Sequence, residues 1–298
     1  MPDRDRLLGA LLGAAVGDAL GAPVDGLSHQ NVRLYYRGIK GYRDDEKRGD
    51  VRAGEWTAHT GRLGALARAL TAHPAAPDAA RSAFDAALGA RPLRRPEALG
   101  ETTAEAAALG AAWALRGWTE EEAMAWVAAL LAERAALTRA AAYGHAFAVR
   151  VALVSALEPE DGRLVLEDVA EEVRAAEATF GAAGRVSDQL HALAGHLDET
   201  PLDLQDRCGG TGTAADEAFP FAAAMFVRNP LLVEATLLSA VNVGGASSAV
   251  GALVGALLGA RNGWTAFPGA WREGLDEAPR LEAEAGAFVD ALRAPAEP

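Results

Sequence analysis

The sequence predicts an all-α protein, and three observations support that fold class. Aromatic residues make up only 6% of the 298 residues, so alanine and leucine must fill the core, and alanine is the strongest helix former because it loses no side-chain entropy. Apolar residues recur with helical spacing along most of the chain. No segment combines the alternating pattern and the tight turn that are typical of a β-hairpin.

In the first half of the chain, the expected helices are separated by glycine and proline. The opening helix should run from Asp5 to about Leu20 and precede a long polar loop over residues 21–54. Thr119 and Glu122 form a Thr-x-x-Glu capping box, which predicts a helix from there to about Arg134. Apolar periodicity predicts the other helices of this half over Thr57–Leu70, Asp78–Leu88, Thr102–Leu115 and Thr138–Leu157.

In the second half, a glycine-rich loop with the sequence CGGTGT, Cys208–Thr213, interrupts the helical pattern. The chain should end in a frayed tail, Ala294–Pro298, after a single domain that covers residues 1–293. The helices predicted in this half are Leu164–Thr179, Val186–Leu197, Ala214–Val227, Leu231–Asn242, Ser247–Ala260, Pro268–Gly274 and Ala278–Leu292.

One of these helices carries a stripe of glycine. Gly251, Gly255 and Gly259 are spaced four residues apart, which places them on one narrow face. Each costs about 1 kcal/mol of helix stability relative to alanine, and the close approach of another helix offsets that cost. We therefore expect the helix over Ser247–Ala260 to lie at the centre of the fold.

Charge and cysteine content limit the partners and the compartment. The formal net charge is −13, whereas proteins that bind nucleic acid or anionic membranes present basic surfaces, so neither is expected as a partner. Cys208 is the only cysteine, which excludes an intrachain disulfide and favours a reducing, cytoplasmic location. The apolar run Leu7–Gly17 follows arginines that alternate with aspartates, so it predicts a helix of the mature fold rather than a signal peptide.

Three stretches, in order, resemble the motifs of a known family. They are LLGALLGAAVGDALGAPVDG, GEWTAHTGRLGALARAL and AVNVGGASSAVGALVGALLGARNG, at Leu7–Gly26, Gly54–Leu70 and Ala240–Gly263. The ADP-ribosylglycohydrolase family has Gly-Asp-Ala-x-Gly, Gly-x-Trp-Thr-Asp-Asp-Thr and Ala-x-Asn-x-Gly-Gly-Asp-x-Asp-Thr at these places. The resemblance covers nearly the whole chain and implies a single-domain orthogonal bundle of helices.

The same resemblance implies a cleft with two magnesium or manganese ions that act on an ADP-ribosyl group. Hard divalent cations select oxygen ligands, mostly carboxylates. Of the six positions that supply ligands in the family, only Thr57 has the family residue, and the other five are Ala58, His59, Ala246, Ser248 and Ala249. Because every carboxylate is absent, we predict no metal ligands and no metal cofactor.

Four side chains near these motifs are candidate site residues. Asp25 lies where several family members have a glutamate that acts on the water or the leaving group, so Asp25 and His59 are the candidate acid and base. Asp18 and Thr57 are candidate ligand-binding residues. Three of them also have a structural interpretation: Asp18 would bond backbone amides and fix a helix exit, Asp25 would shape a turn, and His59 would fill the former metal site.

The glycine-rich loop is a candidate ligand-binding segment because the family has a glycine-rich loop at the phosphates there. Successive backbone amides of Gly209, Gly210 and Gly212 could hold an anion without a metal.

Three functions remain as alternatives. The first is a pseudoenzyme that binds ADP-ribose, a related nucleotide or an ADP-ribosylated protein after losing metal-dependent hydrolysis. The second is a metal-independent hydrolase that uses Asp25 and His59. The third is a structural or protein-interaction protein on the same fold, since some members of this fold family serve as lens crystallins. The oligomeric state stays open.

Overall fold

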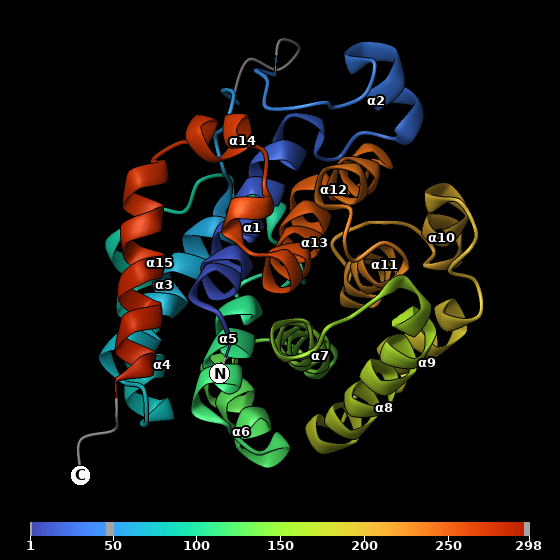
Figure 1. Cartoon of the computed structure of the whole chain (residues 1–298). Helices are drawn as coiled ribbons and strands as arrows, with labels where there is room; N and C mark the ends of the chain where they lie inside the picture. Colours follow the sequence, from blue (N-terminus) through green and yellow to red (C-terminus); the bar gives the residue numbers. More distant parts are fainter. Residues whose placement is uncertain (1, 46–50, 295–298) are drawn as a thin grey trace.

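The computed structural model describes residues 2–45 and 51–294, which form fifteen α-helices and four short 3₁₀ helices (Figure 1). Within these ranges, β pairing is limited to an isolated bridge between Ser28 and Gly244. The all-α prediction is therefore confirmed. The α-helices are α1 (Arg4–Gly21), α2 (His29–Tyr36), α3 (Ala58–Ala72), α4 (Pro77–Ala90), α5 (Ala106–Arg116), α6 (Glu120–Leu130), α7 (Ala136–Val154), α8 (Gly162–Phe180), α9 (Arg185–Ala194), α10 (Pro201–Arg207), α11 (Ala215–Arg228), α12 (Val233–Asn242), α13 (Ser247–Asn262), α14 (Gly269–Gly274) and α15 (Ala278–Arg293).

Helices α1 and α13 lie side by side at the centre of the bundle and run antiparallel (Figure 1). A Cβ atom on Gly255 would lie 2.1 Å from the carbonyl oxygen of Gly13, and one on Gly259 would lie 1.9 Å from that of Gly9. No side chain larger than hydrogen fits at such separations. The central position predicted from the glycine stripe is confirmed, and α1 supplies a matching stripe.

The other helices enclose this pair. Helices α7, α11 and α12 pack against α13, whereas α3 and α15 pack against α1. The outer pair α8 and α9 covers α7 and α11. The segment Arg4–Val24 is apolar and long enough to cross a membrane, but 94% of its most apolar window is buried inside the protein. This burial agrees with the prediction that the opening run is a core helix.

A buried ion pair joins α3 to the start of α5. Arg62 Nε lies 2.7 Å from Glu105 Oε1, and the two side chains are 9% and 0% exposed. The guanidinium also lies over the ring of Phe84, with its carbon 5.1 Å from the ring centroid. The Arg62 charge lowers the pKa of Glu105 against the opposing effect of burial.

Two short helices were not predicted. Residues 21–54, expected to be a loop, contain α2, whose first turn is capped by the Ser28 side chain, which accepts a hydrogen bond from the amide of Asn31. Helix α10 begins with a capping box between Thr200 and Asp203. Both helices bury only one or two side chains, so their apolar periodicity was too weak to detect.

Two predicted boundaries differ from the structure by four residues, and the others by three or fewer. The helix expected over Thr102–Leu115 begins at Ala106, because the preceding residues form turns with hydrogen bonds such as Thr102 N to Leu99 O. The helix expected to reach Arg134 ends at Leu130. Of the predicted frayed tail, residues 295–298 lie outside the described residues, as do residues 46–50 of the predicted loop.

Candidate functional site

The candidate site lies where the first turns of α3 and α13 meet the end of α1. Asp18, on α1, is fully buried, and its Oδ2 accepts hydrogen bonds from the Thr57 amide at 2.9 Å and the Thr60 amide at 3.1 Å. The Thr60 hydroxyl donates to the same oxygen at 2.7 Å. Asp18 therefore holds the start of α3, rather than the exit of its own helix as its structural interpretation proposed.

Asp25 holds the start of α13 in a similar way. Its Oδ1 accepts a 3.0 Å hydrogen bond from the Ser248 amide in the first turn. Burial raises the pKa of Asp25, while the hydrogen bonds from Ser248 and the nearby His59 oppose the shift and Asp18 adds to it. The two carboxylates thus stabilise the two helix N-termini, where negative charge also meets the positive end of the helix dipole.

His59 is completely buried on the first turn of α3, where Thr57 is the N-cap residue. Its ring Nε2 lies 3.2 Å from the carbonyl oxygen of Ala98. A carbonyl only accepts, so this contact places a proton on Nε2, and in the neutral ring Nδ1 is then an acceptor. Nδ1 has no hydrogen-bond partner in the part of the chain that the structure describes.

The residues at the six matched positions do not fit two divalent cations. Thr57 Oγ1 already accepts the His59 amide at 3.4 Å, and the Ser248 hydroxyl carries no charge that would neutralise a cation. Alanine side chains at 58, 246 and 249 carry no donor atom. Across residues 2–45 and 51–294, no group of three or more His, Cys, Asp or Glu side chains is placed to hold a metal ion.

Several buried polar atoms around the site nevertheless lack a protein partner. Within the described ranges, Asp18 Oδ1, His59 Nδ1, Ser247 Oγ and the Tyr42 hydroxyl have no hydrogen bond. Burial raises the pKa of Tyr42, and the charge of Asp18 adds to the rise. Tyr42 and Ser247 were not among the predicted site residues. The position of Tyr42 depends on the path of residues 37–45, for which the sequence gives no periodic signal.

The glycine-rich loop uses its amides internally. Gly209 and Gly210 donate to the carbonyl oxygens of Asp206 and Gln205 at the end of α10. Gly212 donates at 2.7 Å to the carboxylate of Glu217, in the first turn of α11. The Gly212 amide, predicted to hold an anion of the ligand, therefore binds the Glu217 carboxylate instead. Glu217 was not among the predicted site residues.

The loop is nevertheless joined to the candidate site. Thr211 donates from its hydroxyl to the Gly244 carbonyl and accepts from the Ala246 amide through its own carbonyl. On the other side, the Gly26 amide donates to the Gly245 carbonyl at 2.7 Å. The structure therefore brings Asp18, Asp25, Thr57 and His59 together, and it connects the predicted glycines to them through residues 244–246.

Comparison with known proteins agrees with this geometry. A family model described as ADP-ribosylglycohydrolase matches residues 1–297. An uncharacterised protein from Archaeoglobus fulgidus is 26% identical over 307 residues, covering 93% of this chain and 94% of the relative. A solved structure described as an ADP-ribosylglycohydrolase-related protein complex superposes with a TM-score of 0.72 at 24% identity, covering 97% of this chain and 98% of the other. The chain belongs to the ADP-ribosylglycohydrolase family.

Proposed function

We propose that this chain is a family member that no longer performs two-metal hydrolysis and instead binds an ADP-ribosyl group, or a related ribose-containing ligand, without a metal. The loss of hydrolysis is supported by the replacement of five of the six ligand positions, which leaves no carboxylate among them. The two aspartates closest to those positions hold helix starts through Oδ2 of Asp18 and Oδ1 of Asp25.

The observation that carries the binding proposal is the set of unpartnered buried atoms. Leaving a buried polar group without a hydrogen bond costs about 1–3 kcal/mol, so a ligand that pairs with these atoms would recover part of that cost. Asp18 Oδ1 is an acceptor, His59 Nδ1 accepts in the neutral form of the ring, and the Tyr42 hydroxyl both donates and accepts. A ribose presents adjacent hydroxyl groups, which both donate and accept, so its chemistry suits these atoms.

The second candidate is a hydrolase that works without metals. The raised pKa of Asp25, close to His59, is the observation that favours it, because a carboxylate that is harder to ionise becomes a stronger general base. Such acid–base help alone contributes typically about 10²–10⁴-fold. We favour binding without turnover because Asp25 is already engaged by the Ser248 amide.

Isothermal titration calorimetry with ADP-ribose, in EDTA and then in magnesium, tests the binding proposal. We expect saturable binding with the same dissociation constant in both buffers. Tyr42→Phe removes only a hydroxyl and should weaken binding about tenfold, whereas the matched control Tyr35→Phe, on α2, should bind as wild type does. A folded protein that gives no heat of binding would contradict the proposal and favour a structural or protein-interaction role.

An activity assay separates the two candidates. We expect no measurable release of ADP-ribose from ADP-ribosylated arginine or serine, with or without added manganese. Turnover in EDTA that Asp25→Asn abolishes would establish the metal-independent hydrolase instead.

A further inference from the structure

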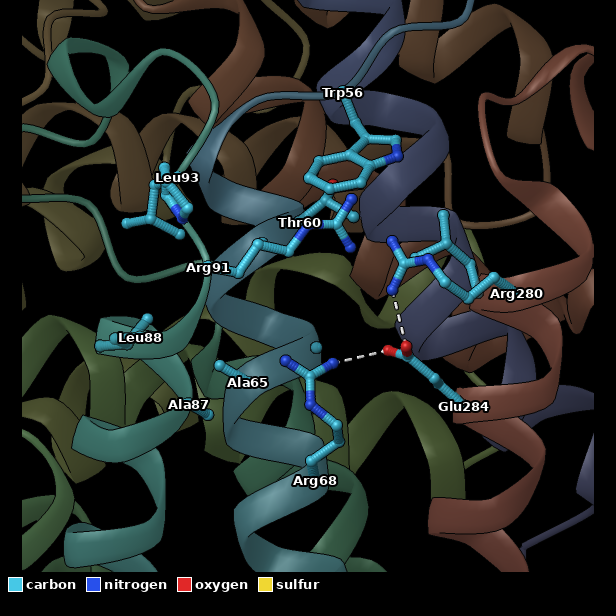
Figure 2. Close-up of a pocket in the computed structure, with 14 residues that line it drawn as sticks. Trp56, Thr60, Ala65, Arg68, Ala87, Leu88, Arg91, Leu93, Arg280 and Glu284 are labelled. Carbon is cyan, nitrogen blue, oxygen red and sulfur yellow. Dashed lines mark hydrogen bonds and ion pairs between the residues drawn. The ribbon is translucent and has the colours of Figure 1, made fainter.

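A hollow lies between α3, α4, the loop at residues 91–93 and α15 (Figure 2). The indole of Trp56 closes one end of it. The Trp56 Nε1 donates to the Asp276 carbonyl oxygen at 3.1 Å, and the guanidinium carbon of Arg94 lies 4.1 Å from the ring centroid. The indole is therefore fixed as a wall of the hollow.

The floor of the hollow is the surface of α3 at Gly61 and Gly64. A Cβ on Gly61 would lie 3.0 Å from the Leu93 side chain, and one on Gly64 would lie 3.3 Å from Arg68 Nη1. These neighbours are side chains, unlike the backbone atoms that face the glycines of α1 and α13, so no helix contact requires glycine here. Glycine is less favourable than alanine inside a helix, and its effect at these two positions is to keep the floor open.

Three guanidinium groups surround this floor, and one carboxylate holds two of them. Glu284 accepts from Arg68 Nη1 at 2.7 Å and from Arg280 Nη1 at 2.6 Å, and Figure 2 shows the two arginines reaching it from different sides. Glu277, which does not line the hollow, accepts hydrogen bonds from both Arg91 and Arg280. The lining is thus locally positive in a chain whose net charge is −13.

The arginines are oriented but not enclosed. The side chains of Arg68 and Arg91 are 45% and 50% exposed, and the Arg91 guanidinium extends across the hollow below the indole (Figure 2). The paired N–H groups of a guanidinium match the paired oxygens of a carboxylate or a phosphate. The cavity volume is about 30 Å³, which is room for a small group of about two water volumes.

We propose that this hollow, between Trp56, Arg68, Arg91 and Arg280, is a binding site for a small oxyanion group, a carboxylate or a phosphate. This proposal does not rest on the proposed function, because none of these four residues carries the unpartnered atoms described above, although Thr60, which donates to Asp18 Oδ2, also lines the hollow. The oxygens of the ligand would accept hydrogen bonds from the exposed guanidinium nitrogens, while Glu277 and Glu284 hold the guanidinium groups in position.

Calorimetry with inorganic phosphate and, separately, with acetate at low ionic strength tests the proposal. We expect saturable binding of at least one probe, and the tighter probe identifies the class of ligand group. Arg91→Gln and Arg68→Gln should each weaken binding about tenfold. Arg163→Gln, which removes an exposed arginine paired with Glu167 on α8, is the control and should bind as wild type does.

The Gly64→Ala variant tests whether the arginines bind a ligand or only form a structural network of ion pairs. The added methyl group should weaken binding by crowding Arg68, while the melting temperature without anion should stay equal to that of wild type or rise. Circular dichroism confirms the fold of each variant. No saturable binding of either probe to the wild-type chain, or equal binding by Arg91→Gln and Arg163→Gln, would overturn the proposal.

Discussion

The Thr60 hydroxyl donates a 2.7 Å hydrogen bond to Asp18 Oδ2, and the same oxygen accepts the amides of Thr57 and Thr60. A fully buried carboxylate on α1 thus fixes the first turn of α3, the element that carries His59. The geometry of the candidate site depends on this contact, because it joins two elements far apart in the chain.

Removing the Asp18 carboxylate should destabilise the protein. Asp18→Ala leaves three buried donors on Thr57 and Thr60 without an acceptor, so we expect the free energy of unfolding to fall by at least about 2 kcal/mol. Asp18→Asn keeps one oxygen and should lose less. Urea unfolding followed by circular dichroism measures both variants, and a loss below about 0.5 kcal/mol for Asp18→Ala would show that the donors find other partners.

The contact between α1 and α13 predicts a second effect on stability. Gly255→Leu would place side-chain atoms against the backbone of α1 and should cost about 1–3 kcal/mol or more. Gly89, in α4, has open space around its Cβ position, so Gly89→Ala should stabilise by about 0.4–1 kcal/mol. Thermal melting compares the two variants. If Gly255→Leu melts as wild type does, the two helices do not pack as described.

The buried ion pair predicts an asymmetry between single and double replacement. Arg62→Met leaves the Glu105 carboxylate buried without its partner and should cost about 3–5 kcal/mol. Arg62→Met combined with Glu105→Leu removes both charges and should recover most of that loss. Urea unfolding of the wild type, both single variants and the double variant forms the cycle. Additive losses would mean that the two charges do not stabilise one another.

His145 predicts how stability depends on pH. Burial lowers the pKa of this fully buried histidine from 6.5 to about 4, although the carbonyls of Thr103 and Leu253 and the charge of Glu105 oppose the shift. Between these values the unfolded chain binds a proton that the folded chain does not. The contribution of His145 to the free energy of unfolding, up to about 3 kcal/mol, is therefore complete above pH 6.5. It is lost as the pH falls toward 4.

Unfolding free energies measured from pH 7 to pH 4 check the histidine prediction. His145→Gln carries no titrating group, so its stability should fall less steeply over this range. Identical slopes for the variant and the wild type would assign the acid sensitivity to other groups.

The central helix was predictable because glycines spaced four residues apart lower helix stability, and the close approach of another helix offsets that loss. The partner helix α1 carries the same spacing at Gly9, Gly13 and Gly17, so that contact was also detectable. Helices α2 and α10 were missed because each buries one or two side chains and is fixed by a cap rather than by periodicity.

The candidate site was predictable only in part. The order of the three motifs indicated that Asp25, Thr57 and His59 lie near one another, and the structure places them at adjoining helix starts. Two other features depend on the paths of irregular segments. They are the hydrogen bond from the Gly212 amide to the Glu217 carboxylate and the position of the Tyr42 hydroxyl, whose pKa the Asp18 charge helps to raise. Such paths are determined by tertiary contacts, which local sequence patterns do not encode.

The manganese content of the purified chain, measured by elemental analysis after equilibration with excess Mn²⁺ and removal of free metal, tests the central claim most directly. The positive control replaces the five departing residues with those of the family, in the variant Ala58→Asp, His59→Asp, Ala246→Asp, Ser248→Asp and Ala249→Thr. Because the matched positions offer no carboxylate, we predict far less than one manganese ion per wild-type chain and more in the variant. Close to two ions per wild-type chain would contradict the account.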